Sequence, residues 1–462
     1  MKDVGKFKRN MRISMGIFIT LFLILIGYMC YSIVTYGERW FATPYNPRLQ
    51  AAIQSIDAGS IYDTNGVELA WTEDGERQYN SRRDVRRAVS HVVGDSTGKT
   101  LGAETTFAKY IYGMDKDIIQ RLQDIANGKS NEGSDIMLTI DSELSEYIYD
   151  NMNAMTGSVV VMNYETGELL ASVSIPTFDP EELKDSDFTP EDTSLVDRAT
   201  MGRYPPGSIM KIVTATAAIE QGIDMEYTCT GEDIIEGQRV TCAGGAKHGT
   251  LDLAGAIEHS CNCYFAQLSV KLGGSALMDV ATDYGFNTEF NFSDLTLYRS
   301  NFETSGNQGD LAWAGIGQYN DLITPLHAAM IAATVANDGV MMEPKLLKSV
   351  EGNSIFSFSF APTEYKRVMS EETAETLKEY MRQVVESGTG TSADIDGAQM
   401  YGKTGTAEFE EDGEVKNHSW FIGFIDDPDH PYAISVIFEG AGFGSRYAAP
   451  MAGKVMQYIV NS

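Results

Sequence analysis

One segment of the sequence, Ile13–Val34, runs for 22 residues without a charged side chain. As an α-helix it would extend about 33 Å at 1.5 Å per residue, enough to cross the ~30 Å hydrocarbon layer of a bilayer. No second run of this kind follows it in the sequence. We therefore predict a single transmembrane helix over residues 13–34, with the rest of the fold on one side of a membrane.

The charges around this run predict its orientation. Basic residues dominate the first twelve positions, against a single Asp3: Lys2, Lys6, Lys8, Arg9 and Arg12. Positive charge favours the cytoplasmic side, so we predict a cytoplasmic tail over residues 1–12 and an extracellular location for everything after residue 34. A cleaved signal peptide is the alternative. The run is longer than the usual 7–15-residue apolar core of such a peptide, and no small-x-small cleavage site follows it. Bulky residues before Cys30 also argue against lipoprotein processing.

The net charge of −30 excludes one broad class of partner. Nucleic-acid binding needs clustered Lys and Arg, so we predict no nucleic-acid partner. After the anchor, residues 35–134 are polar and irregular, with a strand-turn signal around Thr64–Gly66 and one amphipathic helix pattern over Asp117–Gly128. We predict a small supporting module here.

From Asp135 to the C-terminus the sequence predicts a second, α+β domain. IMLTI is strand-like, the following segment to Met155 is helix-like, and residues 157–174 predict a hairpin that turns at Glu165–Gly167. The further predicted helices are Met210–Gln221, Leu253–Leu272, Pro325–Asp338, Glu371–Glu386 and a last one from about Ala449. Strand patterns close the domain at residues 401–409, 419–425 and 432–439. Strands at both ends with helices between them predict a sheet in which the terminal strands meet.

The loop GDSTGKT, residues 94–100, looks like a phosphate-binding loop. Such a loop needs four residues between its first Gly and the Gly-Lys pair, and here only three intervene. It would also lie outside the cell, where nucleotides are scarce. We therefore predict no nucleotide binding, and interpret the glycines as turn residues.

The same loop contains Ser96-x-x-Lys99, one of two Ser-x-x-Lys patterns in the chain. The other, Ser208-x-x-Lys211, follows Pro205-Pro206-Gly207 and starts an apolar, small-residue helix pattern. A serine at a helix N-terminus lies near unpaired N–H groups, and a lysine one turn later lies on the same face. When partly desolvated, that amine can take the proton of the hydroxyl. An isolated match is more often a capping serine followed by a solvated lysine.

Two further motifs strengthen the second pattern. Ser260-Cys261-Asn262 places a hydroxyl and an amide two residues apart, suited to a proton relay and to holding a peptide bond. Lys403-Thr404-Gly405-Thr406 contains the only Lys-Thr-Gly of the chain, within a strand pattern. An edge strand here could pair with an extended peptide while the lysine and threonines hold a carboxylate. The alternative is a solvated edge strand with a bulge at Gly405. A further Ser-x-Asn match, Ser305–Asn307, is interpreted as loop.

Together these motifs resemble the penicillin-binding proteins, and specifically the class B transpeptidases, which are monofunctional and membrane-anchored. The resemblance extends over nearly the whole chain after the anchor, through DIMLTID, GSVVVMNYETGELLASVSIPTFDP, RYPPGSIMKIVTA, TPLHAAMIAATVANDG and GKTGTAE. It implies a transpeptidase domain over residues 135–462, with an antiparallel sheet flanked by helices, and a pedestal or dimerisation-like module over residues 35–134. The implied function is peptidoglycan D,D-transpeptidation in cell-wall synthesis, with a role in cell shape or division and inhibition by β-lactams.

The resemblance also implies a role for each motif residue. Ser208 would attack the penultimate D-alanine carbonyl, and Lys211 would be the general base. Ser260 would relay the proton to the leaving amine, and Asn262 would orient the substrate amide. The third motif would support Ser260 and bind the substrate carboxylate, through Lys403, Thr404, Gly405 and Thr406. The backbone N–H groups of Ser208 and Thr406 would form the oxyanion hole.

Several alternatives and partners follow from the same reading. A D,D-carboxypeptidase or a β-lactamase would use water as the acceptor, and a scaffold or antibiotic sensor would only bind. The anchor and the extra module disfavour a β-lactamase, and the retained Lys211 and Lys403 disfavour a scaffold. No glycosyltransferase pattern precedes Asp135, so we expect a membrane glycosyltransferase as partner. One departure from the family is GIGQY, which has Tyr319 where glycine is usual.

The sequence predicts no cofactor and no metal site. His259, Cys261 and Cys263 hint at a metal, but no fourth ligand follows at suitable spacing. Cys229 and Cys242 flank a Gly-containing segment, so a disulfide that staples this segment and a pair of free thiols are the two alternatives. Cys261 and Cys263 are expected on different sides of a helix, which would prevent a bond between them. His418 is interpreted as a surface residue, with a position in the cleft as the alternative.

Overall fold

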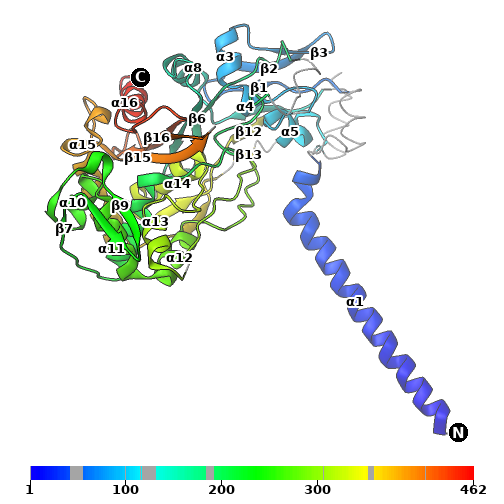
Figure 1. Ribbon diagram of the computed structural model, residues 1–462. Helices are drawn as coiled ribbons and strands as arrows, with labels where there is room; N and C mark the ends of the chain where they lie inside the picture. Colours follow the sequence, from blue (N-terminus) through cyan, green and yellow to red (C-terminus); the bar gives the residue numbers. More distant parts are fainter. Residues whose placement is uncertain are drawn as a thin grey trace.

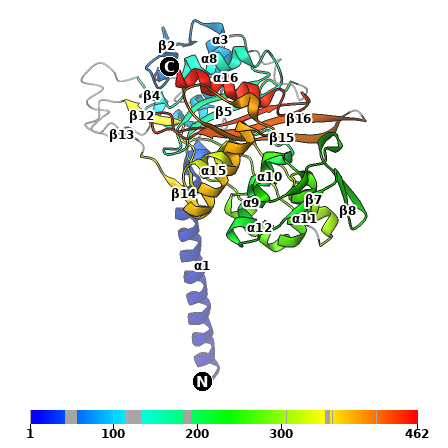
Figure 2. The same cartoon turned by 90° about the vertical axis from the view of Figure 1, so that its left-hand side faces the viewer.

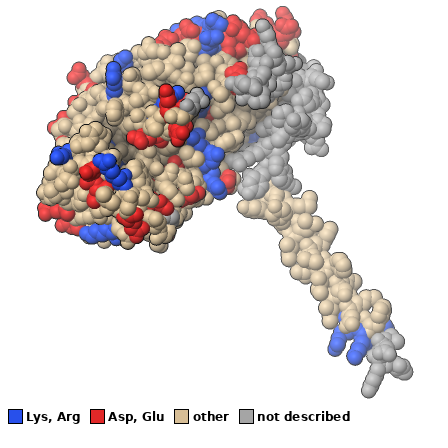
Figure 3. All heavy atoms as spheres, viewed as in Figure 1, with Lys and Arg blue, Asp and Glu red and all other residues tan. Residues whose placement is uncertain are grey.

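The computed structural model describes residues 2–41, 56–98, 100–114, 116, 132–183, 192–304, 306–351, 358–359, 361–411 and 413–462. The helix predicted over Asp117–Gly128 lies outside these ranges. The N-terminal helix α1, Lys2–Phe41, projects from the body of the protein as one rod (Figure 1). Within it, Lys6–Ser32 is long and apolar enough to cross a membrane. The most apolar part of this segment is not buried against the rest of the protein. Lys and Arg side chains gather at the far end of α1, and the middle is free of them (Figure 3). The predicted span over residues 13–34 thus lies in a helix that fits a single-pass anchor.

A five-stranded antiparallel sheet forms the centre of the larger part of the molecule. Its strand order is β15-β16-β17-β5-β6. The strands are β5 Gly157–Asn163, β6 Leu169–Ile175, β15 Met400–Glu411, β16 Glu414–Ile425 and β17 Tyr432–Phe438. The hairpin β5–β6 turns at the predicted place, where Gly167 adopts φ +81°. Because β17 pairs with β5, strands from the two ends of the domain meet, which confirms the predicted α+β sheet.

Helices cover both faces of this sheet. On one face lies α14, Pro325–Ala336, which is buried along its whole length, as expected for a helix that is apolar all round. On the other face lie α8, Ser142–Asn151, and α16, Ala448–Val460 (Figure 2). Successive side chains along a strand point to opposite faces of the sheet, so each strand contributes to the core on both faces. In β5, Val160 packs with the core on the α14 side, and Val159 and Val161 pack with the core on the α16 side.

A helical region lies on the same side of the sheet as α14, and it carries two of the three motifs. Its helices are α9 Lys211–Glu220, α10 Leu253–Glu258, α11 Asn262–Leu272, α12 Gly274–Asp283, α13 Gln308–Ala314 and α15 Glu371–Glu386. The single helix predicted over Leu253–Leu272 is wrong, because the chain breaks between α10 and α11. Ser260 has φ +52°, which a helix cannot accommodate, and the Cys261 thiol then caps α11 by accepting the Tyr264 N–H. The break creates a corner at the second motif.

A six-stranded sheet joins the segments on either side of residue 135. Its order is β13-β12-β4-β1-β2-β3. The strands are β1 Ile61–Tyr62, β2 Glu68–Glu73, β3 Glu76–Tyr79, β4 Asp135–Leu138, β12 Leu347–Glu351 and β13 Phe358–Ser359. β4 pairs with β1 in parallel and with β12 in antiparallel fashion. The predicted boundary after residue 134 therefore falls between strands of one sheet.

Short elements complete the described chain. They are the helices α3 Arg83–Ala88, α4 Ser90–Val93, α5 Ala103–Thr106 and α6 Ala108–Ile111, and the strand pairs β7 Tyr227–Cys229 with β10 Gly249–Leu251, β8 Glu232–Ile235 with β9 Gln238–Thr241, and β11 Val340–Met342 with β14 Glu364–Arg367.

The loop over residues 94–100 is a turn built around a carboxylate. Asp95 accepts from the backbone N–H groups of Thr97 (2.8 Å) and Thr100 (2.7 Å), and also from their hydroxyls. Gly94 and Gly98 adopt positive φ. The Thr97 and Thr100 N–H groups are satisfied by Asp95, and the two glycines lie in turn conformations, which confirms their interpretation as turn residues. Lys99 lies outside the described residues.

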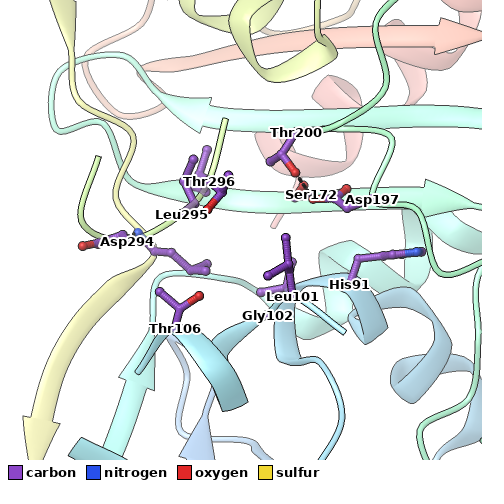
Figure 4. Close-up of a pocket in the computed structure, with 13 residues that line it drawn as sticks. His91, Leu101, Gly102, Thr106, Ser172, Asp197, Thr200, Asp294, Leu295 and Thr296 are labelled. Carbon is purple, nitrogen blue, oxygen red and sulfur yellow. Dashed lines mark hydrogen bonds between the residues drawn. The ribbon is translucent and has the colours of Figure 1, made fainter. Parts of the chain in front are cut away.

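A small cavity of about 50 Å³ lies between this loop region and the central domain. His91, Leu101 and Gly102 line one side, and Asp197 and Asp294 face them (Figure 4). The charged groups already have partners. His91 Nε2 contacts Ser194 O at 2.8 Å, Asp197 accepts from Thr200, and Asp294 accepts two backbone N–H groups. The cavity is a packing gap between two parts of the molecule.

A buried histidine predicts acid sensitivity of the fold. His327 on α14 is fully enclosed, its Nε2 donates to Tyr284 O (2.8 Å), and its Nδ1 lies 2.7 Å from Ser300 Oγ. Burial lowers the pKa of His327 to about 4, so the folded state holds it neutral. In the unfolded chain its pKa is ~6.5, so this contribution is complete above pH ~6.5 and is lost as the pH falls towards 4. It amounts to about 3 kcal/mol.

Thermal unfolding of the full-length protein in detergent tests this, measured from pH 7.5 to 4. We expect His327→Gln to unfold at lower temperature than the wild type at pH 7.5. The gap should narrow towards pH 4, because only the wild type loses the histidine contribution. Parallel pH profiles for the two proteins would contradict the assignment.

Candidate active site

Ser208 lies in a 3₁₀ turn, Gly207–Met210, that runs directly into α9. The turn is fixed by Gly207, which has φ +55° and donates its N–H to Gly317 O at 2.9 Å. A Cβ at this glycine would approach Thr406 O to 2.5 Å, so only glycine lets the turn pack against β15. Ser208 is half-buried at this junction. The predicted position at the start of a helix is confirmed.

Lys211 lies one turn further along and is completely buried. Its Nζ donates to Asn262 Oδ1 (2.6 Å) and Ser260 O (2.7 Å), and lies 3.1 Å from Ser260 Oγ. Burial lowers its pKa to about 8, which outweighs the opposing effect of nearby cysteines. The lysine is therefore easier to deprotonate than one in water.

Lys403 approaches the same hydroxyl from β15. Its Nζ donates to Ser260 Oγ (2.9 Å) and to Thr404 O (3.0 Å), and it is also completely buried. Burial lowers its pKa well below the usual value, and the charge on Lys211 adds to this effect. Two lysines thus converge on Ser260 Oγ. With Lys211 neutral, Ser260 can accept from Lys403 and donate its own proton to Lys211.

Asn262 is held by contacts on both sides of its amide. Its Nδ2 donates to Thr241 O at 2.8 Å, which leaves Oδ1 facing Lys211. The left-handed conformation of Ser260 turns its hydroxyl and the Asn262 amide towards the same lysine. The first and second motifs therefore meet at the Lys211 amine.

β15 is an edge strand, and its outer edge faces Ser208. Thr406 O and the Glu408 N–H both contact the Gln318 side chain (3.3 Å each), so the main chain at 406 and 408 points away from β16. A strand repeats every two residues, so the main chain at Thr404 also points away from β16. Register with β16 is unbroken from Met400 to Glu411, so the alternative of a bulge at Gly405 is wrong. That glycine is needed for packing, because a Cβ there would lie 2.8 Å from Trp420 Cβ and 3.0 Å from Ile209 Cγ2.

A cleft of about 440 Å³ joins the three motifs. Its walls include Ser208, Ser260, Asn262, Thr404, Gly405 and Thr406, while Lys211 and Lys403 lie buried beneath them. All eight predicted site residues are thus brought together. Their catalytic and binding roles remain predictions at this point.

The sequence reasoning missed several residues in or next to this cleft. Thr389 Oγ1 contacts Thr404 Oγ1 at 2.6 Å, and the Gly444 N–H donates to Thr406 Oγ1 at 3.3 Å. Trp420 Nε1 donates to Pro205 O at 3.0 Å, which ties β16 to the turn before Ser208. Gln318 also lines the cleft, and it is the one missed residue that the sequence pointed to, as the glutamine of GIGQY. Its neighbour Tyr319 lines a groove that extends the cleft along β15.

The structure tests two further interpretations, those of His418 and Asn307. His418 is buried, with its ring stacked on Phe409 and edge-on to Tyr204, so both the surface and the cleft positions are wrong. Burial lowers its pKa to about 4. Asn307 caps α13 by accepting from the N–H groups of Gly309 and Asp310, which confirms a structural role for the second Ser-x-Asn match. Ser305 lies outside the described residues.

The cysteines depart from the predicted arrangement. Cys229 and Cys242 are free thiols whose sulfurs lie 3.6 Å apart, so the disulfide considered from the sequence is not formed. Cys261 and Cys263 do not lie on opposite sides of one helix. Because Cys261 precedes α11, both sulfurs approach Cys242, at 3.8 and 3.6 Å.

Comparisons with known proteins identify the family. Residues 157–457 match the model of the penicillin-binding protein transpeptidase domain. The chain is 29% identical to the peptidoglycan D,D-transpeptidase PbpA of Mycolicibacterium smegmatis, over 95% of this chain and 96% of that protein. It is 30% identical to PbpA of Mycobacterium tuberculosis, over 96% and 97%. Among solved structures, the ceftriaxone acyl-enzyme complex of penicillin-binding protein A from M. tuberculosis matches with a TM-score of 0.80 and 27% identity, covering 88% of this chain and 99% of that one.

The matched segment contains all three motifs, and the alignment with PbpA covers almost the whole chain. The cleft, the edge strand and the two buried lysines thus lie within the matched region. The chain belongs to the family of penicillin-binding protein transpeptidases.

Proposed function

We propose that Ser208 is the residue through which this chain, a peptidoglycan D,D-transpeptidase of the class B penicillin-binding proteins, forms its acyl-enzyme. One observation carries the assignment: Lys211 and Lys403 both contact Ser260 Oγ, beneath the cleft that Ser208 lines. Burying two amines around one hydroxyl costs free energy, so stability alone does not account for the pair. It is suited to moving a proton.

In acylation, Ser208 Oγ attacks the carbonyl carbon of the penultimate D-alanine. The new C–O bond forms, and the Ser208 proton passes to neutral Lys211. Collapse of the tetrahedral intermediate breaks the C–N bond to the terminal D-alanine. The leaving amine takes its proton from Ser260, which regains one from Lys211. A β-lactam acylates the same oxygen, but its amine stays attached because it is part of the ring system.

The edge of β15 supports the binding of the donor peptide. Its outward main chain at Thr404 can pair with an extended peptide, and the Thr406 N–H and Ser208 N–H can donate to the oxyanion. Removing one such donor typically costs about 3–4 kcal/mol in the transition state. The hydroxyls of Thr404 and Thr406 would hold the terminal carboxylate, and Gly405 allows the Ser208 turn to approach this strand closely.

In the second half-reaction an amine from a neighbouring stem peptide attacks the ester. The C–O bond to Ser208 breaks, a new amide bond forms, and the amine proton returns to Ser208 through Lys211. Water in place of the amine would make the enzyme a D,D-carboxypeptidase.

An acceptor competition assay tests this function. Full-length protein in detergent is labelled with fluorescent penicillin, and the modified peptide is identified by mass spectrometry. A separate, unlabelled sample of the protein is given a D-Ala-D-Ala stem peptide together with an amine acceptor. We expect one adduct on the peptide that contains Ser208, and cross-linked product in excess over hydrolysed product. An adduct on another residue would overturn the site assignment, and hydrolysis alone would show a carboxypeptidase.

The orientation of the anchor is also part of the proposal. The basic side chains at the far end of α1 support a cytoplasmic N-terminus and an extracellular catalytic domain. Cross-linking acts on glycan strands that must first be polymerised, so a membrane glycosyltransferase is the proposed partner. Protease added to intact cells should remove the catalytic domain, and affinity purification of the membrane protein should recover the glycosyltransferase.

A further inference from the structure

Four side chains that could bind a metal converge beside the second motif. Cys229 ends β7, Cys242 follows β9, His248 precedes β10, and Cys261 caps α11. Their ligand atoms all lie within 4.8 Å of one another. Thus three loops of the helical region, separated in sequence, meet at one point.

The distances between these atoms match a tetrahedral metal site. Cys229 Sγ lies 3.6 Å from both Cys242 Sγ and His248 Nδ1, and Cys242 Sγ lies 3.8 Å from Cys261 Sγ. Zinc–sulfur bonds of ~2.3 Å and zinc–nitrogen bonds of ~2.0 Å at tetrahedral angles place two sulfurs about 3.8 Å apart and a sulfur and a nitrogen about 3.6 Å apart. The spacing leaves room for one ion at the centre.

Disulfide bonds do not explain the arrangement. A disulfide needs an S–S distance of about 2.05 Å and joins only two sulfurs. Here Cys242 lies at nearly equal distances from three other sulfurs, those of Cys229, Cys261 and Cys263. A disulfide between any two of these cysteines would not explain why two further buried thiols and a histidine lie next to it.

Backbone contacts support metal-bound thiolates at two of the ligands. The Gly231 N–H donates to Cys229 Sγ, and the Tyr264 N–H donates to Cys261 Sγ, both at 3.4 Å. Such second-layer contacts orient ligands and stabilise their charge. The His248 ring stacks on His259, which fixes its plane. Cys263, the remaining sulfur near Cys242, lies outside the set of four.

We propose that Cys229, Cys242, His248 and Cys261 bind a structural Zn²⁺ ion. Binding would release the three thiol protons to solvent and leave a centre with a net charge of −1. No open position remains for a substrate, since all four ligands come from the protein. The site therefore has a structural role.

The position of Cys261 links this ion to the reaction, an extension that rests on the proposed function. Cys261 lies between Ser260 and Asn262, and Thr241, whose carbonyl holds the Asn262 amide, directly precedes Cys242. Ser260 keeps a left-handed conformation that is unfavourable for a serine. A metal–thiolate bond at the next residue would hold that corner in place, so these ligands act as positioning residues for Ser260 and Asn262.

Metal analysis of the full-length protein in detergent provides the first test. The protein is purified without chelators, and its metals are measured by elemental mass spectrometry. We expect about one zinc per chain, and its loss in Cys229→Ser and His248→Ala. The matched control is Cys30→Ser, which removes a thiol in α1 and should keep the zinc. Wild type without zinc, or equal zinc in all four proteins, would overturn the site.

A second measurement covers variants that fail to fold. The wild type is denatured with chelator and without reductant, and its thiols are alkylated and counted by mass. A metal site predicts five alkylated cysteines, whereas a disulfide predicts three and would overturn the proposal. In native wild type loaded with Co²⁺, absorption bands of a tetrahedral thiolate complex are expected, and their absence would count against the ligand set.

The positioning role is tested by acylation. Removing zinc from the wild type should slow labelling by fluorescent penicillin by about tenfold or more, and Zn²⁺ but not Mg²⁺ should restore it. Unchanged labelling in protein shown to be metal-free would overturn the positioning role. If zinc is present but wild type takes no label, the proposed function fails while the metal site stands.

Discussion

Ser208→Ala is expected to take no covalent label from fluorescent penicillin and to form no cross-linked product. The change removes the only atom proposed to form the ester, and loss of a nucleophile lowers acylation by about 10⁴-fold or more. The fold should be unaffected, since the side chain is small and half-buried at the mouth of the cleft. Gel fluorescence after timed labelling measures the effect, and the thermal midpoint checks the fold.

The matched control for this variant is Ser96→Ala, in the other Ser-x-x-Lys pattern of the chain. Ser96 lies in the turn around Asp95, away from the residues that line the cleft. The control should label at the wild-type rate. Equal labelling of Ser208→Ala and wild type would refute the assignment of the nucleophile.

Lys211→Met is expected to lower the rate of acylation by about 10²–10⁴-fold, the usual contribution of a general base. Methionine fills similar space but has no amine, so the Ser208 proton has no acceptor. The contacts of Lys211 with Ser260 O and Asn262 Oδ1 are lost as well. Stopped-flow measurement of the acylation rate over a range of penicillin concentrations separates this loss from weaker binding.

Lys211→Arg distinguishes a base from a positive charge. Arginine retains the charge and can donate hydrogen bonds, but it does not lose its proton in a protein. If Lys211 acts as the base, arginine should be as inactive as methionine. Substantial recovery by arginine would mean that the residue acts only through its charge and its hydrogen bonds.

Much of the site was predictable because its chemistry is encoded in short local patterns. Pro206, Gly207 and the apolar helix after Ser208 predicted the helix start, and the strand pattern around Lys403 predicted β15. Patterns of this kind depend on neighbours in the sequence. The split between α10 and α11 was missed because residues 253–272 keep helical periodicity through the break, while Ser260 takes a left-handed conformation set by the packing around it.

The contacts that depend on distant segments could not be predicted in this way. His418 was interpreted as a surface residue because a turn-like acidic segment precedes it, yet Phe409 and Tyr204 enclose its ring. The proposed metal ligands could not be predicted for a similar reason. The sequence around Cys261 and Cys263 offers no fourth ligand at suitable spacing, whereas Cys229, Cys242 and His248 come from the ends of short strands and the loops between them. Which loops meet is decided by tertiary packing.

The contact of Gln318 with β15 has a consequence for solubility. An open edge strand exposes unpaired N–H and C=O groups, and these invite association with other chains. Gln318 occupies the Thr406 carbonyl and the Glu408 N–H, so an incoming strand cannot continue its pairing past this point. A single amide thereby shortens the open edge of β15 beside the positions proposed to bind the donor peptide.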